Sequence, residues 1–164
     1  MKTKINKVSL GQIGIKGGAL IYVALLLYFL FIENFDLIGS PIAWSFNFII
    51  LFAGLYFVYR YYRSQTSLNV EYFQGLLLGS LTSVISSVAY ASFVFIDFTF
   101  IAPDELALLE KNWLFMGSPM TAFTASGATL IEGLSSGLMI SFILMQYYKS
   151  GFKQLINLNP VELP

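Results

Sequence analysis

Four long apolar blocks, separated by short polar connections, dominate the pattern of this chain. They cover residues 13–32, 42–61, 72–101 and 121–148. A bilayer core of about 30 Å needs about 20 helical residues, so every block is long enough to cross it. The blocks lack the strict alternation of membrane β-strands, and a helix pairs its own backbone polar groups in lipid. The pattern predicts an all-α membrane protein whose four transmembrane helices form an antiparallel bundle.

The flanking segments set the expected domain organisation. Residues 1–12 form a basic N-terminus, residues 13–148 the transmembrane domain, and residues 149–164 a polar tail. The first apolar block is longer than the core of a signal peptide, and no small-x-small cleavage site follows it. We therefore expect this block to be retained as the first span.

Basic residues lie almost entirely on one side of the predicted bundle. With the N-terminus inside, eight of the nine Lys and Arg residues fall in inner segments, and Lys111 alone falls in an outer one. Positive charge favours the cytoplasmic side of a membrane. The sequence predicts a multi-pass protein of the bacterial inner (cytoplasmic) membrane, with both termini in the cytoplasm.

The outer connection between the third and fourth spans has a helical pattern. Residues 103–105 (Pro-Asp-Glu) are a typical helix start with acids in the first turn, and Leu106, Leu109 and Trp113 follow at helical spacing. Residues 117–119 end the pattern. We expect a short amphipathic helix on the outer membrane surface. A solvent-facing connector is the alternative.

Composition excludes several function classes. Hydrophobic residues make up 57% of the chain and charged ones 11%, against roughly 25% charged in soluble domains. The chain has no Cys and no His, which excludes disulfides, thiol nucleophiles, imidazole bases and most zinc sites. The carboxylates are scattered and no phosphate-binding loop occurs. We expect no enzyme activity, no cofactor, no metal site and, at zero net charge, no nucleic-acid partner.

Two rows of small residues predict how the helices pack. Each row recurs every four residues, so it lines one face of a helix. The third block contributes Gly75, Gly79, Ser83, Ser87 and Ala91, and the fourth contributes Thr129, Gly133, Gly137 and Ser141. Small residues let helix backbones approach closely in lipid. The rows predict that these two spans pack antiparallel; alternatively, one row forms a dimer interface or docks another subunit.

Glu132 is the most unusual polar residue. It lies eleven residues beyond position 121, near mid-bilayer. A charged carboxylate there costs roughly 2.5–3.5 kcal/mol, so Glu132 must face the bundle or a wet pocket. At similar depth the third span offers Ser83, Ser86, Ser87 and Tyr90 as partners. Three readings remain: an uncharged acid hydrogen-bonded to these hydroxyls, a proton- or cation-binding site, or a contact to another subunit.

Asp97 is a second acid within the predicted spans. It lies about one turn from the outer end of the third span. We expect its side chain to reach out to the membrane interface. Asn47, at comparable depth on the second span, is a possible hydrogen-bond partner.

Several short motifs resemble a bacterial family. They are Lys16-Gly17-Gly18 at the first span, Tyr59-Arg60-Tyr61-Tyr62-Arg63 ending the second, Tyr72-Phe73-Gln74-Gly75-Leu76 opening the third, and Phe98-Thr99-Phe100-Ile101-Ala102-Pro103-Asp104 at its exit. Over about residues 8–150 the chain resembles domain of unknown function 4199, found chiefly in Bacteroidota. The resemblance implies a four-helix inner-membrane protein of a Gram-negative cell and carries no established activity.

The functional expectation rests on the small size of the chain, the lack of catalytic residues and the helix faces of small residues that can pack against a partner. We expect an accessory or assembly subunit of a larger membrane complex, with the lipid bilayer and other membrane subunits, or a second copy, as partners. The alternative is a small proton- or cation-coupled transporter or channel subunit that uses Glu132. A membrane enzyme or lipid-binding module is a third, less favoured class.

Overall fold

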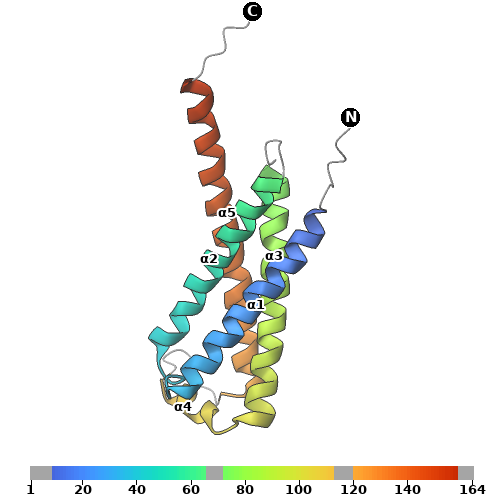
Figure 1. Ribbon diagram of the computed structural model, residues 1–164. Coiled ribbons are helices and arrows are strands. Elements are labelled where there is room, and N and C mark those ends of the chain that lie inside the picture. The colour runs from blue at the N-terminus through green and yellow to red at the C-terminus, as the bar shows by residue number, and fades with distance from the viewer. Residues whose placement is uncertain (1–8, 66–71, 113–119, 159–164) are drawn as a thin grey trace, which may run out of the picture.

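The computed structural model describes residues 9–65, 72–112 and 120–158, and this part of the chain is helical throughout apart from short connections. In chain order it has α1 (Leu10–Asn34), α2 (Pro41–Gln65), α3 (Tyr72–Ile96), a π-helical turn η1 (Asp97–Ile101), α4 (Glu105–Asn112) and α5 (Ala122–Leu158) (Figure 1). Four of these helices, with η1 extending α3, are long and apolar enough to cross a membrane. The fold is that of a multi-pass helical membrane protein.

The helix boundaries lie close to the predicted ones, except at the C-terminal side. Ser9 caps α1, where its hydroxyl accepts a hydrogen bond from the backbone N–H of Gln12 at 3.2 Å. Pro41 opens α2, where a missing N–H costs nothing. Residues 149–158, assigned above to the tail, continue α5 as a helix. No strong helix breaker interrupts this segment, and the helix ends two residues before Pro160, whose ring disfavours a helical conformation in the residue before it.

Helix α3 holds the bundle together. It packs most extensively against α5 and then against α1, while α2 packs against α1, α5 and, less closely, α3. The first turn of α1 and the last turn of α5 lie at one end of the bundle, which we call the terminal end; α4 lies at the other, the α4 end (Figure 1). Because the described part of the chain has an even number of long apolar helices, four, the first helix begins and the last helix ends at the same end of the bundle.

An aromatic cluster fills the bundle near the α4 end. Phe29 is fully buried and makes edge-to-face contacts with Trp44, Tyr90, Phe93 and Phe98, with ring centroids 5.3–6.4 Å apart. The indole N–H of Trp44 donates to the Ile38 carbonyl at 2.7 Å. This bond ties the start of α2 to the connection that follows α1, so the corner before the second span is fixed.

Helix α4 packs its apolar side against the bundle. Leu109 is buried, with 3% of its surface exposed, and Leu106 packs against the same core. The helix begins where the Pro-Asp-Glu pattern predicted, at Glu105. Trp113 and residues 117–119 lie outside the described residues. Contact of α4 with the membrane surface stays a prediction.

Candidate functional site: a polar pocket between three helices

The interface between α3 and α5 is built from the two rows of small residues. Each step of four residues forward along α3 is matched by four residues back along α5. The contacting pairs are Gly75 with Met145, Gly79 with Ser141, Ser83 with Gly137, and Ser87 with Gly133. A Cβ atom added at any of these glycines would overlap its partner's side chain. The two helices therefore run antiparallel in close contact, with one register over about three turns.

The hydroxyls of this interface bond to their own helices. Ser83 donates to the Gly79 carbonyl at 2.8 Å and Ser141 to the Gly137 carbonyl at 2.7 Å. Ser86 donates to the Ser83 carbonyl at 3.2 Å. Such local bonds satisfy a serine without help from a neighbouring helix. Within the described residues no hydrogen bond joins Glu132 to Ser83, Ser86, Ser87 or Tyr90, so the predicted hydroxyl partners of Glu132 do not bond to it.

A pocket that combines several polar side chains with a mostly apolar accessible surface lies beside this interface, where α2 meets α3 and α5 and where Leu25 of α1 adds one wall. It encloses about 30 Å³, which is room for about two water molecules. Glu132, Ser136 and Thr129 lie one turn apart on α5 and share a face. The lining residues are Leu25, Asn47, Phe48, Leu51, Ser87, Tyr90, Thr129, Glu132, Gly133 and Ser136. Of the sequence-predicted polar residues, the pocket brings together Glu132, Ser87 and Tyr90.

Two buried polar atoms of the pocket lack a hydrogen-bond partner of good geometry. They are the Tyr90 hydroxyl and the side-chain oxygen of Asn47, which lie next to each other. The Tyr90 side chain is only 3% exposed. Glu132 is close enough to interact electrostatically with Tyr90, yet its own side chain is exposed on the outside of the bundle. The pocket thus has an open side at Glu132 and unsatisfied polar atoms at its inner end.

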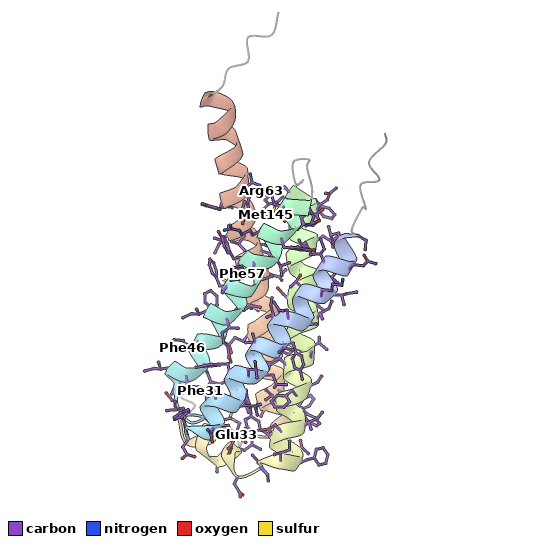
Figure 2. The ribbon with its side chains drawn as sticks, in the orientation of Figure 1. Phe31, Glu33, Phe46, Phe57, Arg63 and Met145 are labelled. Atoms are coloured by element: carbon purple, nitrogen blue, oxygen red, sulfur yellow. The ribbon has the colours of Figure 1, made fainter. Side chains whose placement is uncertain are left out.

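No positive charge of the described part of the chain reaches this pocket. Lys16, Arg60 and Arg63 are the basic residues whose side chains are described, and none of them lines it. Arg63 instead lies over the Tyr148 ring at the terminal end, 5.4 Å from its centroid (Figure 2). Glu132 is therefore not neutralised by any described cation.

The Asp97 side chain was expected to reach out to the membrane interface, but it is buried in the bundle. Its side chain is 2% exposed, and its Oδ2 atom is buried without a partner among the described residues. Asp97 lies three residues after Val94 and seven after Tyr90, so it continues the buried face of α3. The π-helical turn begins at Asp97, where the Ala102 N–H donates to the Asp97 carbonyl five residues back at 2.9 Å. Asn47 is not its partner, because Asn47 faces Tyr90.

A second group of acids, which the sequence analysis missed, gathers at the α4 end. Burial, followed by the negative charges of Glu33, Asp97 and Asp36, raises the pKa of Glu105 to about 7. The Oε2 atom of Glu105 is buried without a partner in the described structure. Figure 2 shows Glu33 beside α4. The available clue was that Glu33, Asp36 and Glu105 all fall in or next to the two predicted outer connections. The first-turn position of Glu105 in a helix explained that residue without a neighbouring acid.

Tyr59 was missed as well. Its hydroxyl is buried between α2, α3 and α5 and donates to the Gly75 carbonyl at 2.6 Å, against Gly79 and Ser141. An aromatic residue near a predicted membrane edge gave no sign of this three-helix junction. The bond fixes α2 over the tightest part of the α3–α5 interface.

The described side chains contain no group of three or more Asp or Glu residues arranged to hold a metal ion. Comparison with protein families, with curated proteins and with solved structures finds no match for this chain. The resemblance to domain of unknown function 4199 therefore stays a prediction.

Proposed function

We propose that this protein is an accessory or assembly subunit of a larger membrane complex, and that its α2–α5 side docks a membrane helix of another subunit. The observation that carries the proposal is the exposure of Glu132 on the outside of a membrane-spanning helix. Two further features of the sequence support it: the helix faces made of small residues, which suit close packing, and the lack of catalytic residues.

The depth of Glu132 makes its exposure costly. It follows Ala122 by ten residues, so it lies roughly 15 Å along α5, about halfway through a bilayer core of about 30 Å. Ionisable groups at this depth face the interior of a bundle or pair with one another. A polar group of a docked helix would cover Glu132 and remove most of this cost.

The surface around Glu132 suits a second membrane helix. Ile131, beside Glu132, is 67% exposed, and Phe48 of α2, which lines the pocket, is 43% exposed. Apolar side chains around one polar group are what a partner helix needs in lipid, where packing and interhelical hydrogen bonds drive association.

The proposal places the protein in a bacterial inner membrane, with the terminal end in the cytoplasm. Arg60 and Arg63 of α2 belong to this end, and Lys149 and Lys153 follow the fourth span on the same side. Glu33, Asp36, Asp104 and Glu105 belong to the α4 end. This distribution supports the orientation through the preference of positive charge for the cytoplasmic side.

Site-specific photo-crosslinking tests the docking proposal. A photoreactive amino acid at Ile131 is expected to form a protein adduct of one defined mass, whose second component co-purifies stoichiometrically in mild detergent. The same amino acid at Val88, which is 48% exposed and lies on the outer face of α3, is the matched control and should label lipid only. Lipid adducts alone at Ile131, or an adduct with a second copy of this chain, would contradict an accessory subunit.

A second candidate function has its own support. The buried Asn47 and Tyr90 oxygens, which lie beside each other next to Glu132, would also suit a proton- or cation-coupled carrier. If the protein is such a carrier, purified protein in proteoliposomes carries a proton or Na⁺ flux, and Glu132→Gln reduces that flux to the level of protein-free vesicles. Ser92→Ala, which removes an exposed hydroxyl bonded only to its own helix, is the control and should leave the flux unchanged. Flux that survives Glu132→Gln would exclude the carrier role.

A further inference from the structure

We propose that the Glu132 pocket receives the ammonium group of a lysine carried by the docked helix. This inference rests on the proposed function and names the chemistry of the partner. It would make Glu132 one half of an intersubunit ion pair in the middle of the membrane.

The polar atoms of the pocket call for hydrogen-bond donors. Glu132 on α5 offers two carboxylate oxygens at the open side of the pocket, whereas the amide oxygen of Asn47 and the hydroxyl of Tyr90 lie buried beside each other behind it. A lysine ammonium has three donors and no acceptor, so it complements the carboxylate of Glu132.

The size and walls of the pocket favour lysine over arginine. The cavity of about 30 Å³ has room for a compact ammonium, whereas a guanidinium is a broad plane with donors in a rigid fork. Leu25, Phe48 and Leu51 supply apolar walls along which a four-carbon stem can lie. The polar end and the apolar walls together have the two-part character of a lysine side chain.

The charge must come from outside the described chain. None of the lining residues is basic, and the open side of the pocket at Glu132 faces away from the bundle. A lysine at mid-membrane depth in a partner would be as unfavourable alone as Glu132 is. Pairing removes both unpaired charges at once, and removing either partner leaves a buried charge behind. The ion pair would thus select one partner helix and one depth.

Defined transmembrane peptides test the assignment with the full-length protein in phosphatidylcholine vesicles. The probes are four versions of one apolar transmembrane peptide with uncharged flanking residues. They differ only in the central residue, which is Lys, Arg, Gln or Leu. Binding is measured by energy transfer between the peptide and the protein. We expect the Lys peptide to bind about tenfold more tightly than the Leu peptide, in keeping with interhelical polar contacts of about 1–2 kcal/mol. Glu132→Gln should abolish this difference.

Val88→Gln is the matched control, because it places a polar side chain on the exposed face of α3, away from the docking side, and should leave the preference intact. Equal binding of the Lys and Leu peptides, or of the Lys and Arg peptides, overturns the ammonium assignment. If a protein adduct at Ile131 persists in that case, docking stands and only the lysine is wrong. Loss of that adduct sinks the docking proposal itself.

Discussion

Replacing Gly137 by leucine is expected to destabilise the bundle by about 3 kcal/mol or more, the largest effect of any single change outside the pocket. Even one Cβ atom at this position would overlap the Ser83 side chain on α3. Leucine adds three further carbons in a contact that holds α5 against the central helix, and overpacked sites typically cost 1–3 kcal/mol or occasionally more. The measurement is the midpoint of thermal unfolding in detergent, followed by the loss of the monodisperse peak.

Gly127→Leu is the control on the same helix. A Cβ atom at Gly127 would meet nothing within 4 Å, so leucine there should change the midpoint little. If both variants lose the same stability, helix propensity or insertion is responsible, and close α3–α5 contact is not what stabilises the fold.

Exchanging the two residues of the pair sharpens this test. Gly137→Ser alone should destabilise, whereas Gly137→Ser combined with Ser83→Gly moves one hydroxymethyl group from α3 to α5 at nearly constant volume. The double variant should recover about 1 kcal/mol or more relative to the sum of the single ones, since residues in direct contact couple by 0.5–3 kcal/mol. Additive effects would show that Ser83 and Gly137 do not touch.

The spans and the α3–α5 pairing were predictable because each depends on a simple periodic property. Twenty apolar residues are needed to cross lipid, and that length is visible without any tertiary information. A small residue every fourth position marks one face of a helix, and only a close neighbour makes use of such a face. The register was not predictable, because sliding either helix by four residues again places small residues on small residues. The structure selects the register that pairs Gly137 with Ser83 and Gly79 with Ser141.

The polar residues were harder to place, for reasons specific to each. Ser83 and Ser87 were expected to bond Glu132, but they face Gly137 and Gly133, so Glu132 is displaced to the edge of the interface. Asp97 was placed by its depth alone, although it follows buried Val94 by three residues and Tyr90 by seven and therefore lies on the buried face of α3. Both errors come from rotations of a residue about a helix axis, which depth along the span does not reveal.

The acids at the α4 end and the acid in the pocket share one physical problem. Glu105 and Asp97 each bury a carboxyl oxygen without a described partner, and Glu132 exposes a carboxyl where lipid is expected. An unpaired buried polar group costs roughly 1–3 kcal/mol, more if charged. The protein keeps three such groups in spite of this cost. This pattern is typical of sites where stability is given up for interaction or response, and it is the reason the proposals centre on these carboxyls.

Docking of α4 on the bundle is expected to weaken as pH rises from about 4.5 to about 7. The ordinary pKa of a glutamate is 4.5, and burial with the neighbouring charges of Glu33, Asp97 and Asp36 raises the pKa of Glu105 to about 7. A group whose pKa is higher in the docked state favours the docked state when it is protonated. That contribution is complete below pH 4.5 and is lost as pH rises through 7. Hydrogen exchange of the α4 amides, corrected for the chemical exchange rate at each pH, measures it.

Protection of residues 105–112 should fall roughly tenfold between pH 5 and pH 8. This is less than the full pKa difference of Glu105 would give, because Glu105 is partly exposed and water screens its charge. Glu105→Gln should hold protection high at both pH values, since the amide keeps the shape and never ionises. Glu33→Gln removes the neighbouring charge that raises the pKa of Glu105 most, so it should move the transition to lower pH. Asp104→Asn, beside Glu105 but exposed, should leave it in place. A pH response that persists in Glu105→Gln would mean that Asp97 or another group titrates at this end, and that the buried carboxyl of α4 does not control its docking.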